Sequence, residues 1–302
     1  MKVGVVGIGN IAQKAYLPIY AEARDQADFY FASSQKSTRQ LLKNRYGFKH
    51  VYENITELLA EKMDGILIHA ATKAHYSLIK KCLEAGVHVF VDKPLTESAV
   101  QSLELQQLAQ RRGLLLMAGF NRRFAPLVQE LKATPEKHLL ILQKHRINKP
   151  QPVKFVIYDL FLHLVDTAVY LLEEPAVFAG GGLMVKDGLL HQAHLQLKTA
   201  SSSAFLHMDL VSGTNLENYQ LTATNGRLEL AELTRLTVTD QQQIVEKRGN
   251  DWETTLTKRG FAPMVTAFLK GVETGDGSCL RQERVLLSHQ LCDELLQHAS
   301  QD

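Results

Sequence analysis

The feature that most constrains the fold lies at the start of the chain, where the apolar residues 3–6 run directly into Gly7-Ile8-Gly9-Asn10-Ile11-Ala12. In this G-x-G-x-x-A pattern Gly7 permits a tight turn, Gly9 lets the backbone approach a pyrophosphate, and Ala12 keeps the following helix close to the sheet. The phosphates then lie at a helix N-terminus, which favours negative charge. We therefore expect a dinucleotide site formed by Gly7, Gly9, Asn10 and Ile11.

Further apolar runs follow at regular intervals, at residues 27–32, 65–68, 87–91 and 114–117. Between them lie helical patterns, such as residues 76–83 and 98–110, each closed by a glycine. Continuous apolar strands that alternate with helices indicate a parallel sheet covered on both faces. The sequence therefore predicts an α/β fold in which residues 1–120 form a doubly wound Rossmann domain.

The tip of the second predicted strand bears on which dinucleotide binds. A site that prefers NAD has Asp or Glu here to hold the ribose 2′-hydroxyl, whereas this tip reads Ser33-Ser34-Gln35-Lys36-Ser37-Thr38-Arg39. Hydroxyl groups and cations without an acid suit a 2′-phosphate, so we expect NADP rather than NAD, bound by Ser33, Ser34 and Arg39. The alternative is a helix capped by Ser34 or Ser37, which explains the serines but not the missing carboxylate.

Two further strand tips are expected at the same edge. Pro94 prevents regular continuation of the strand at residues 87–91, so Asp92 and Lys93 lie at its carboxyl end, where open α/β sheets bind ligands. The alternative is a surface lysine after an ordinary strand. The preceding strand ends in residues 70–75, from which we expect Ala70, Thr72 and His75 to contact the cofactor, although His75 has the alternative of capping or packing.

The second half of the chain, residues 121–302, is expected to form another domain. Asp159, His163 and Asp166 stand four and then three residues apart, so on a helix they share one face among leucines and valines. Buried polar groups must find partners or do chemistry, and the alternative to catalysis is a satisfied core histidine with a capping aspartate.

Beyond residue 175 the patterns alternate as strands do, at residues 194–197, 204–208 and 219–223. Turn signals occur at Gly180-Gly181-Gly182, Asp187-Gly188 and Asn225-Gly226, and a closing helix is expected at about residues 282–298. One-sided alternation is typical of an antiparallel sheet whose other face meets helices or another subunit, so we expect a homodimer or tetramer formed through this sheet.

Composition excludes several classes of protein. A formal net charge of +2 over 302 residues argues against a nucleic-acid-binding surface, so the partner is expected to be a small molecule. Cys82, Cys279 and Cys292 lack the spacing of a disulfide framework, and no metal-ligand cluster is expected. Without a signal peptide or a long apolar run we expect no membrane span and a cytoplasmic location.

The glycine fingerprint, Asp92-Lys93-Pro94 and Gly119-Phe120-Asn121-Arg122-Arg123-Phe124 together resemble the Gfo/Idh/MocA family of nicotinamide-dependent oxidoreductases, and the chain looks closest to the bacterial MviM-type members. The resemblance implies a C-terminal α/β domain with an open, mostly antiparallel sheet. It also implies that Lys93 contacts the nicotinamide ribose and the substrate hydroxyl. Asp159 and His163 match the family's Asp-x-Gly-x-His, with Asp166 as its later acid. Asp92 replaces the family's usual Glu, which is one methylene longer. Phe161 replaces the family glycine, and this bulky ring puts the shape of the substrate pocket in question.

These residues predict a dehydrogenase or reductase acting on CH–OH groups, and the resemblance implies a sugar, polyol or related substrate. We expect His163 to be the acid/base, Lys93 to stabilise the developing alkoxide, and Asp159 to orient the substrate or the imidazole. Asn121 and Arg122 are expected to border the nicotinamide or the substrate. The alternatives are a glycosidase that uses NAD-dependent redox chemistry transiently, and a non-catalytic nucleotide-binding regulatory protein.

Overall fold

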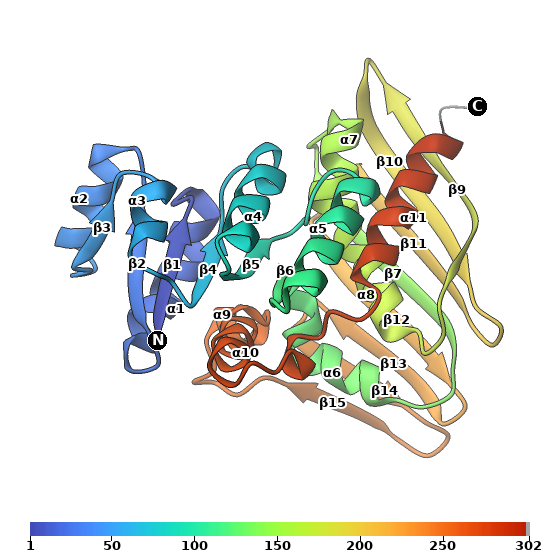
Figure 1. The fold of residues 1–302 in the computed structure, drawn as a ribbon. Helices are drawn as coiled ribbons and strands as arrows, with labels where there is room; N and C mark the ends of the chain where they lie inside the picture. The colour runs from blue at the N-terminus through green and yellow to red at the C-terminus, as the bar shows by residue number, and fades with distance from the viewer. Residues whose placement is uncertain (300–302) are drawn as a thin grey trace. The chain divides into compact units, whose positions relative to one another are not determined.

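The computed structural model describes residues 1–299, so the last three residues of the predicted second domain lie outside the described part of the chain. Two compact units are present (Figure 1): Met1–Gly119 with Phe261–Gln282, and Phe120–Gly260 with residues 283–299. The division differs from the expected one because residues 261–282 return to the first unit. Phe268 in this segment packs on Phe90 with ring centroids 5.7 Å apart, which explains the return.

The first unit contains a six-stranded sheet of order β3-β2-β1-β4-β5-β6, in which every neighbouring pair is parallel. This is the strand order of a doubly wound dinucleotide-binding fold, whose ligand crevice lies at the carboxyl ends of the strands beside the central β1. The predicted fold class is confirmed. The strands are β1 Lys2–Val6, β2 Asp28–Ala32, β3 His50–Tyr52, β4 Gly65–Ile68, β5 His88–Asp92 and β6 Leu116–Gly119.

Helical segments of the first unit begin and end at sequence signals. Asn54 caps α3 by accepting hydrogen bonds from the backbone N–H groups of Thr56 and Glu57, and Gly113, with a φ of 63°, ends α5 in the left-handed region. The helical segments are η1 Ala12–Tyr16, α1 Leu17–Glu22, η2 Ala23–Asp25, α2 Lys36–Asn44, α3 Ile55–Ala60, η3 Thr72–Ala74, α4 His75–Glu84, α5 Ala99–Arg112, α10 Phe261–Thr274 and η6 Ser278–Leu280.

The second unit is built on a nine-stranded sheet of order β15-β14-β13-β12-β7-β11-β10-β8, with β9 paired to β10. Only β7 and β11 run parallel, so the expectation of an open, mostly antiparallel sheet is confirmed. The strands are β7 Lys137–Ile147, β8 Gln151–Pro152, β9 Val177–Lys186, β10 Leu189–Lys198, β11 Ser203–Ser212, β12 Leu216–Ala223, β13 Gly226–Ala231, β14 Arg235–Thr239 and β15 Ile244–Arg248.

One predicted turn is wrong. Gly180-Gly181-Gly182 lies inside β9, paired with β10, rather than at a bend. A Cβ at Gly181 would lie 2.7 Å from a methyl carbon of Leu295, and a Cβ at Gly182 would lie 2.8 Å from the ring of His194. Gly181 and Gly182 therefore allow close packing of this strand against its neighbours.

One face of the large sheet is covered by α8 and α11, which pack against each other (Figure 1). Every residue of α8 is buried, because it lies between β7 and β11 on one side and α11 on the other. The helical segments of this unit are η4 Asn121–Phe124, α6 Pro126–Ala133, α7 Val153–Val156, η5 Ile157–Phe161, α8 Leu162–Leu171, α9 Thr255–Lys258 and α11 Val285–His298. Among residues 1–299 no helix is long and apolar enough to cross a membrane.

Candidate functional site

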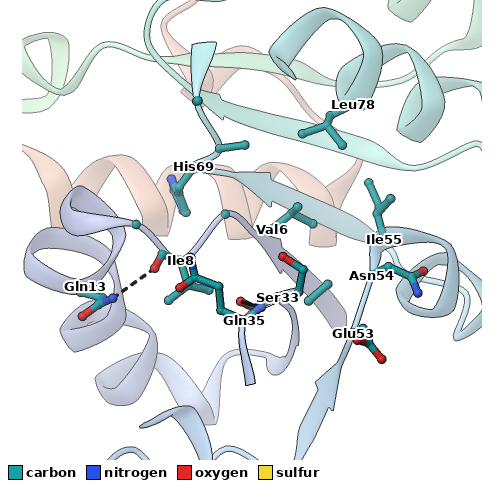
Figure 2. Close-up of a pocket in the computed structure, with 16 residues that line it drawn as sticks. Val6, Ile8, Gln13, Ser33, Gln35, Glu53, Asn54, Ile55, His69 and Leu78 are labelled. Atoms are coloured by element: carbon teal, nitrogen blue, oxygen red, sulfur yellow. Dashed lines mark hydrogen bonds between the residues drawn. The ribbon is translucent and has the colours of Figure 1, made fainter. Parts of the chain in front are cut away.

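A pocket of about 730 Å³ opens in the first unit at the carboxyl ends of β1, β2 and β4 (Figure 2). This is the edge at which open α/β sheets bind ligands. Of the residues expected to bind the cofactor, five line the pocket: Gly7, Gly9, Ser33, Ser34 and Ala70.

The glycine turn has the geometry that a dinucleotide requires. Gly7 has a φ of 88°, and a Cβ there would lie 2.3 Å from the backbone nitrogen of Ala70, so only glycine fits. A Cβ at Gly9 would meet no atom within 4 Å, which leaves open space beside the backbone. The Gln13 side chain donates to the carbonyl of Ile8 at 3.1 Å, the bond dashed in Figure 2, and holds the turn. This pocket fits a dinucleotide pyrophosphate.

At the β2 tip, Arg39 is fixed by the backbone. Its Nη1 donates to the carbonyl oxygens of Ser33 at 2.8 Å and of Ser34 at 2.9 Å. The same nitrogen lies 3.8 Å from Oε1 of Glu53, an exposed carboxylate that lines the pocket from the connection after β3. Glu53 was not predicted, because an acid that binds the ribose is expected directly after β2, whereas this one follows β3.

The other expected cofactor residues of this unit lie outside the pocket lining: Asn10, Ile11, Arg39, Thr72, His75, Asp92 and Lys93. His75 is buried, and each of its ring nitrogens lies close to a backbone carbonyl oxygen. Its Nδ1 lies 2.8 Å from the carbonyl oxygen of Pro94, and its Nε2 lies 3.0 Å from that of Ala70. The imidazole thus ties the tip of β4 to the turn after β5.

Lys93 directly follows β5, as the proline pattern predicts, and is half-buried. The preceding carboxylate, Asp92, accepts a hydrogen bond from the Lys93 backbone N–H at 2.9 Å and one from the Tyr16 hydroxyl at 3.3 Å. Burial raises the pKa of the Asp92 carboxyl, although the neighbouring Lys93 charge acts in the opposite direction.

His69, at the carboxyl end of β4, is a pocket residue that sequence reasoning missed. Its ring stacks on Tyr16 with centroids 3.9 Å apart, and its Nε2 lies 2.6 Å from the Tyr20 hydroxyl oxygen. Burial lowers the pKa of His69 to about 3, and nearby His75 acts in the same direction, so the ring is neutral at pH 7. Its Nδ1 is buried without a hydrogen-bond partner among the described residues. An unpaired polar atom beside a pocket suits a ligand group.

The second unit contains a buried charge cluster. Glu217 Oε1 accepts from Arg122 Nε at 2.9 Å, and Glu217 Oε2 accepts from Arg122 Nη2 at 3.0 Å and from Lys144 Nζ at 3.1 Å. Tyr219 donates its hydroxyl to the same carboxylate. The third guanidinium nitrogen, Arg122 Nη1, lies 3.0 Å from Nδ1 and 3.1 Å from Nε2 of His163. Two of the residues expected to bind substrate, Arg122 and His163, are therefore in contact.

Burial and charge act against each other in this cluster. Burial alone would raise the pKa of Glu217, but the charges of Arg122 and Lys144 hold it well below its usual range. Burial, assisted by the Arg122 charge, lowers the pKa of Lys144 to about 7. Lys144 and Glu217 were missed, although the alternation Leu140, Leu142, Lys144 directs this lysine to the core face of β7.

Asp166 has partners of its own. It accepts from Arg123 Nε at 2.9 Å and Nη2 at 2.8 Å, and from the Ser288 hydroxyl at 3.0 Å, all in the interior. Asp159 is half-buried in the π-helical turn η5, whereas His163 and Asp166 are buried in α8. Phe161, in the family's glycine position, is fully buried.

Asn121 belongs to the second unit. Its amide nitrogen donates to the carbonyl of Arg259 at 2.7 Å, and its side-chain oxygen accepts from Arg122 at 3.0 Å. Asn121 therefore helps to fix the guanidinium of Arg122. Among residues 1–299 no group of three or more His, Cys, Asp or Glu side chains is arranged to hold a metal ion.

Comparison with known proteins adds independent information. Residues 1–120 match a family model described as an oxidoreductase family with an NAD-binding Rossmann fold, and residues 126–241 match a YceM-like C-terminal domain. The YceM protein of Salmonella typhimurium is 31% identical over 99% of this chain and 98% of its own length. A crystal structure of the dehydrogenase MviM from Clostridium difficile superimposes with a TM-score of 0.93, at 29% identity and 99% coverage of both chains. A myo-inositol 2-dehydrogenase of Thermotoga maritima is 28% identical over 62% of this chain and 60% of its own.

Proposed function

Because this chain belongs to the Gfo/Idh/MocA family of NAD-binding oxidoreductases, we propose that it is a dehydrogenase or reductase for the CH–OH group of a sugar or polyol. The nicotinamide ring, when bound, supplies the hydride acceptor or donor. The observation that carries the proposal is the pocket around Gly7 and Gly9, which has the turn and the open space that a dinucleotide needs.

In this proposal His163 exchanges a proton with the substrate hydroxyl. Arg122 Nη1 lies 3.0 Å from Nδ1 and 3.1 Å from Nε2 of His163, so the guanidinium fixes the position of the ring. A neutral imidazole is the form that can take a proton from an alcohol.

Lys93 is assigned the stabilisation of the developing alkoxide, and Asp159 the orientation of substrate hydroxyls or of the imidazole. Two features support these roles. Lys93 stands at the carboxyl end of β5, and Asp159 is half-buried in η5, four residues before His163.

The test is to incubate the purified protein with NAD or NADP and a panel of sugars and polyols, following reduced-cofactor absorbance and products. Lys93→Met and His163→Gln should each lower the rate about 10²-fold or more. Lys73→Met, which changes an exposed lysine after β4, is the control and should keep the rate. Full turnover by Lys93→Met would contradict the role of that amine. Cleavage of a glycosidic bond without net reduction of the cofactor would indicate the glycosidase alternative. Cofactor binding without any turnover would indicate the regulatory alternative.

The proposed cofactor preference is NADP over NAD. It is supported by the fixed guanidinium of Arg39 at the β2 tip and by the serines that line the pocket beside it. Glu53 acts against the preference for NADP, because its carboxylate lies beside Arg39 at the tip of β2. Titrating the protein with each cofactor and comparing dissociation constants tests the proposal.

The proposal also includes a homodimer or tetramer in the cytoplasm. The sheet face opposite α8 exposes apolar side chains on β11, of which Phe205 and Val211 are each 41% exposed, and apolar surface of this kind suits a subunit contact. All three cysteines are free thiols, as is usual in a reducing compartment. Light scattering of the purified protein and of Phe205→Glu tests the assembly, since a charge at the contact should yield monomers.

A further inference from the structure

The charge cluster of the second unit contains one more cation than its carboxylate can balance. Arg122 and Lys144 both contact Glu217, and all three side chains are at least nine-tenths buried. Arg122 takes both carboxylate oxygens in a bidentate pair, whereas Lys144 has one contact, to Oε2. When both cations are protonated the cluster carries an excess positive charge in the protein interior, which is unfavourable.

Lys144 is the member of the cluster that can release this charge. A guanidinium stays protonated in proteins, whereas an amine titrates when it is buried. Burial and the nearby Arg122 charge lower the pKa of Lys144 to about 7, against the opposing effect of Glu217. The net charge of the cluster therefore changes close to neutral pH, without any change in Arg122.

We propose that Lys144 is a positioning residue for the reaction: through Glu217 it holds Arg122 against His163, and its charge controls how readily His163 becomes protonated. The catalytic meaning of this inference rests on the proposed function, whereas the chain of contacts from Lys144 through Glu217 and Arg122 to His163 is independent of it. Arg122 connects Glu217 to the imidazole through opposite edges of one rigid, planar group. A change in the charge of Lys144 therefore alters the position and the electrostatic environment of His163.

The groups that face Lys144 support this single link. On β12 the group is Glu217, which also accepts from Tyr219. The helix α8 packs against β7, and its titratable residues His163 and Asp166 contact Arg122 and Arg123. On its own strand Arg146 adds positive charge. The titratable residues of β11, His207 and Asp209, lie on the other face of the sheet, because that strand alternates and Met208 points to the core.

The experiment is nuclear magnetic resonance on the whole protein without substrate, labelled with ¹³C at lysine Cε and in the histidine ring. In the wild-type protein one lysine signal should titrate near pH 7, and the His163 signal, assigned with His163→Gln, should show an inflection at the same pH. Lys144→Met should abolish that lysine titration and move the His163 midpoint upward by about one pH unit, because a nearby positive charge is removed.

Lys137→Met is the matched control, since Lys137 is a buried lysine of the same strand with a separate partner, Glu173, at 3.0 Å. It should leave the His163 curve unchanged. If Lys144→Met does not fold, Lys144→Arg keeps a permanent charge and should remove the inflection without the upward shift. A wild-type protein in which every lysine titrates above pH 9, or identical His163 curves in the wild type and Lys144→Met, would overturn the inference. Because no substrate is used, these results are independent of whether Lys93→Met and His163→Gln lose turnover.

Discussion

Replacing Asp166 by Asn should impair stability rather than chemistry. In the family pattern Asp166 is the later acid of the histidine segment, but in this structure its carboxylate neutralises Arg123, whose side chain is fully buried. The asparagine side chain introduced by Asp166→Asn would retain one oxygen and present an amide group to a guanidinium that can only donate.

The magnitude follows from burial. Asp166 is 1% exposed and Arg123 0%, so neither charge can be resolvated by water when its partner is lost. Breaking a buried ion pair by removing one partner costs about 3–5 kcal/mol. That is a large share of the roughly 5–15 kcal/mol by which native proteins are stable. An exposed pair differs: Arg248 and Glu246 lie 2.7 Å apart but are 67% and 43% exposed, and losing this pair costs less than about 1 kcal/mol.

Urea unfolding followed by circular dichroism measures both losses. Asp166→Asn should lower the free energy of unfolding by about 3–5 kcal/mol, and Glu246→Gln should leave it nearly unchanged. Removing both buried charges, as Arg123→Met with Asp166→Leu, should recover part of the loss, because no unpaired charge remains. If Asp166→Asn is as stable as the wild type and loses turnover instead, the assignment of Asp166 to the ion pair is wrong.

Four other substitutions test the dinucleotide pocket and the residues around it. Gly7→Ala should prevent cofactor binding and destabilise the fold, because the added Cβ would meet the Ala70 backbone. Gly9→Ala should fold normally and only weaken cofactor binding. Fluorescence titration with reduced cofactor distinguishes the two variants. Arg39→Ala should weaken NADP binding about tenfold, by loss of a charge-assisted hydrogen bond, and leave NAD binding unchanged in the same titration. The folded pKa of His69, about 3, lies below its unfolded value, so its contribution to stability is present above about pH 6.5 and is lost as the pH falls towards 3. Between pH 6.5 and 4.5 the wild type should therefore lose about 2–3 kcal/mol more stability than His69→Asn in urea unfolding; equal losses would contradict a buried neutral ring.

Local pattern was sufficient to predict the parallel sheet of the first unit. The sheet of β1 to β6 follows from apolar strands that alternate with capped helices, and the exception, β3, is a short strand of three residues at the sheet edge. Gly7 was identified correctly as a turn residue because the strand-to-helix reversal makes a specific demand on its φ. The glycines of β9 were misinterpreted, since a run of glycines looks the same whether it permits a turn or the close approach of Leu295.

The amino-acid sequence by itself determined the fold class and the dinucleotide fingerprint, because these depend on residues that are neighbours along the chain. Only the tertiary structure decided which charges meet. Arg122 and Arg123 are adjacent in sequence, yet the first is paired with Glu217 and the second with Asp166. Such pairings join residues about 40 to 95 positions apart, and no local periodicity encodes a contact that packing of a sheet against a helix creates.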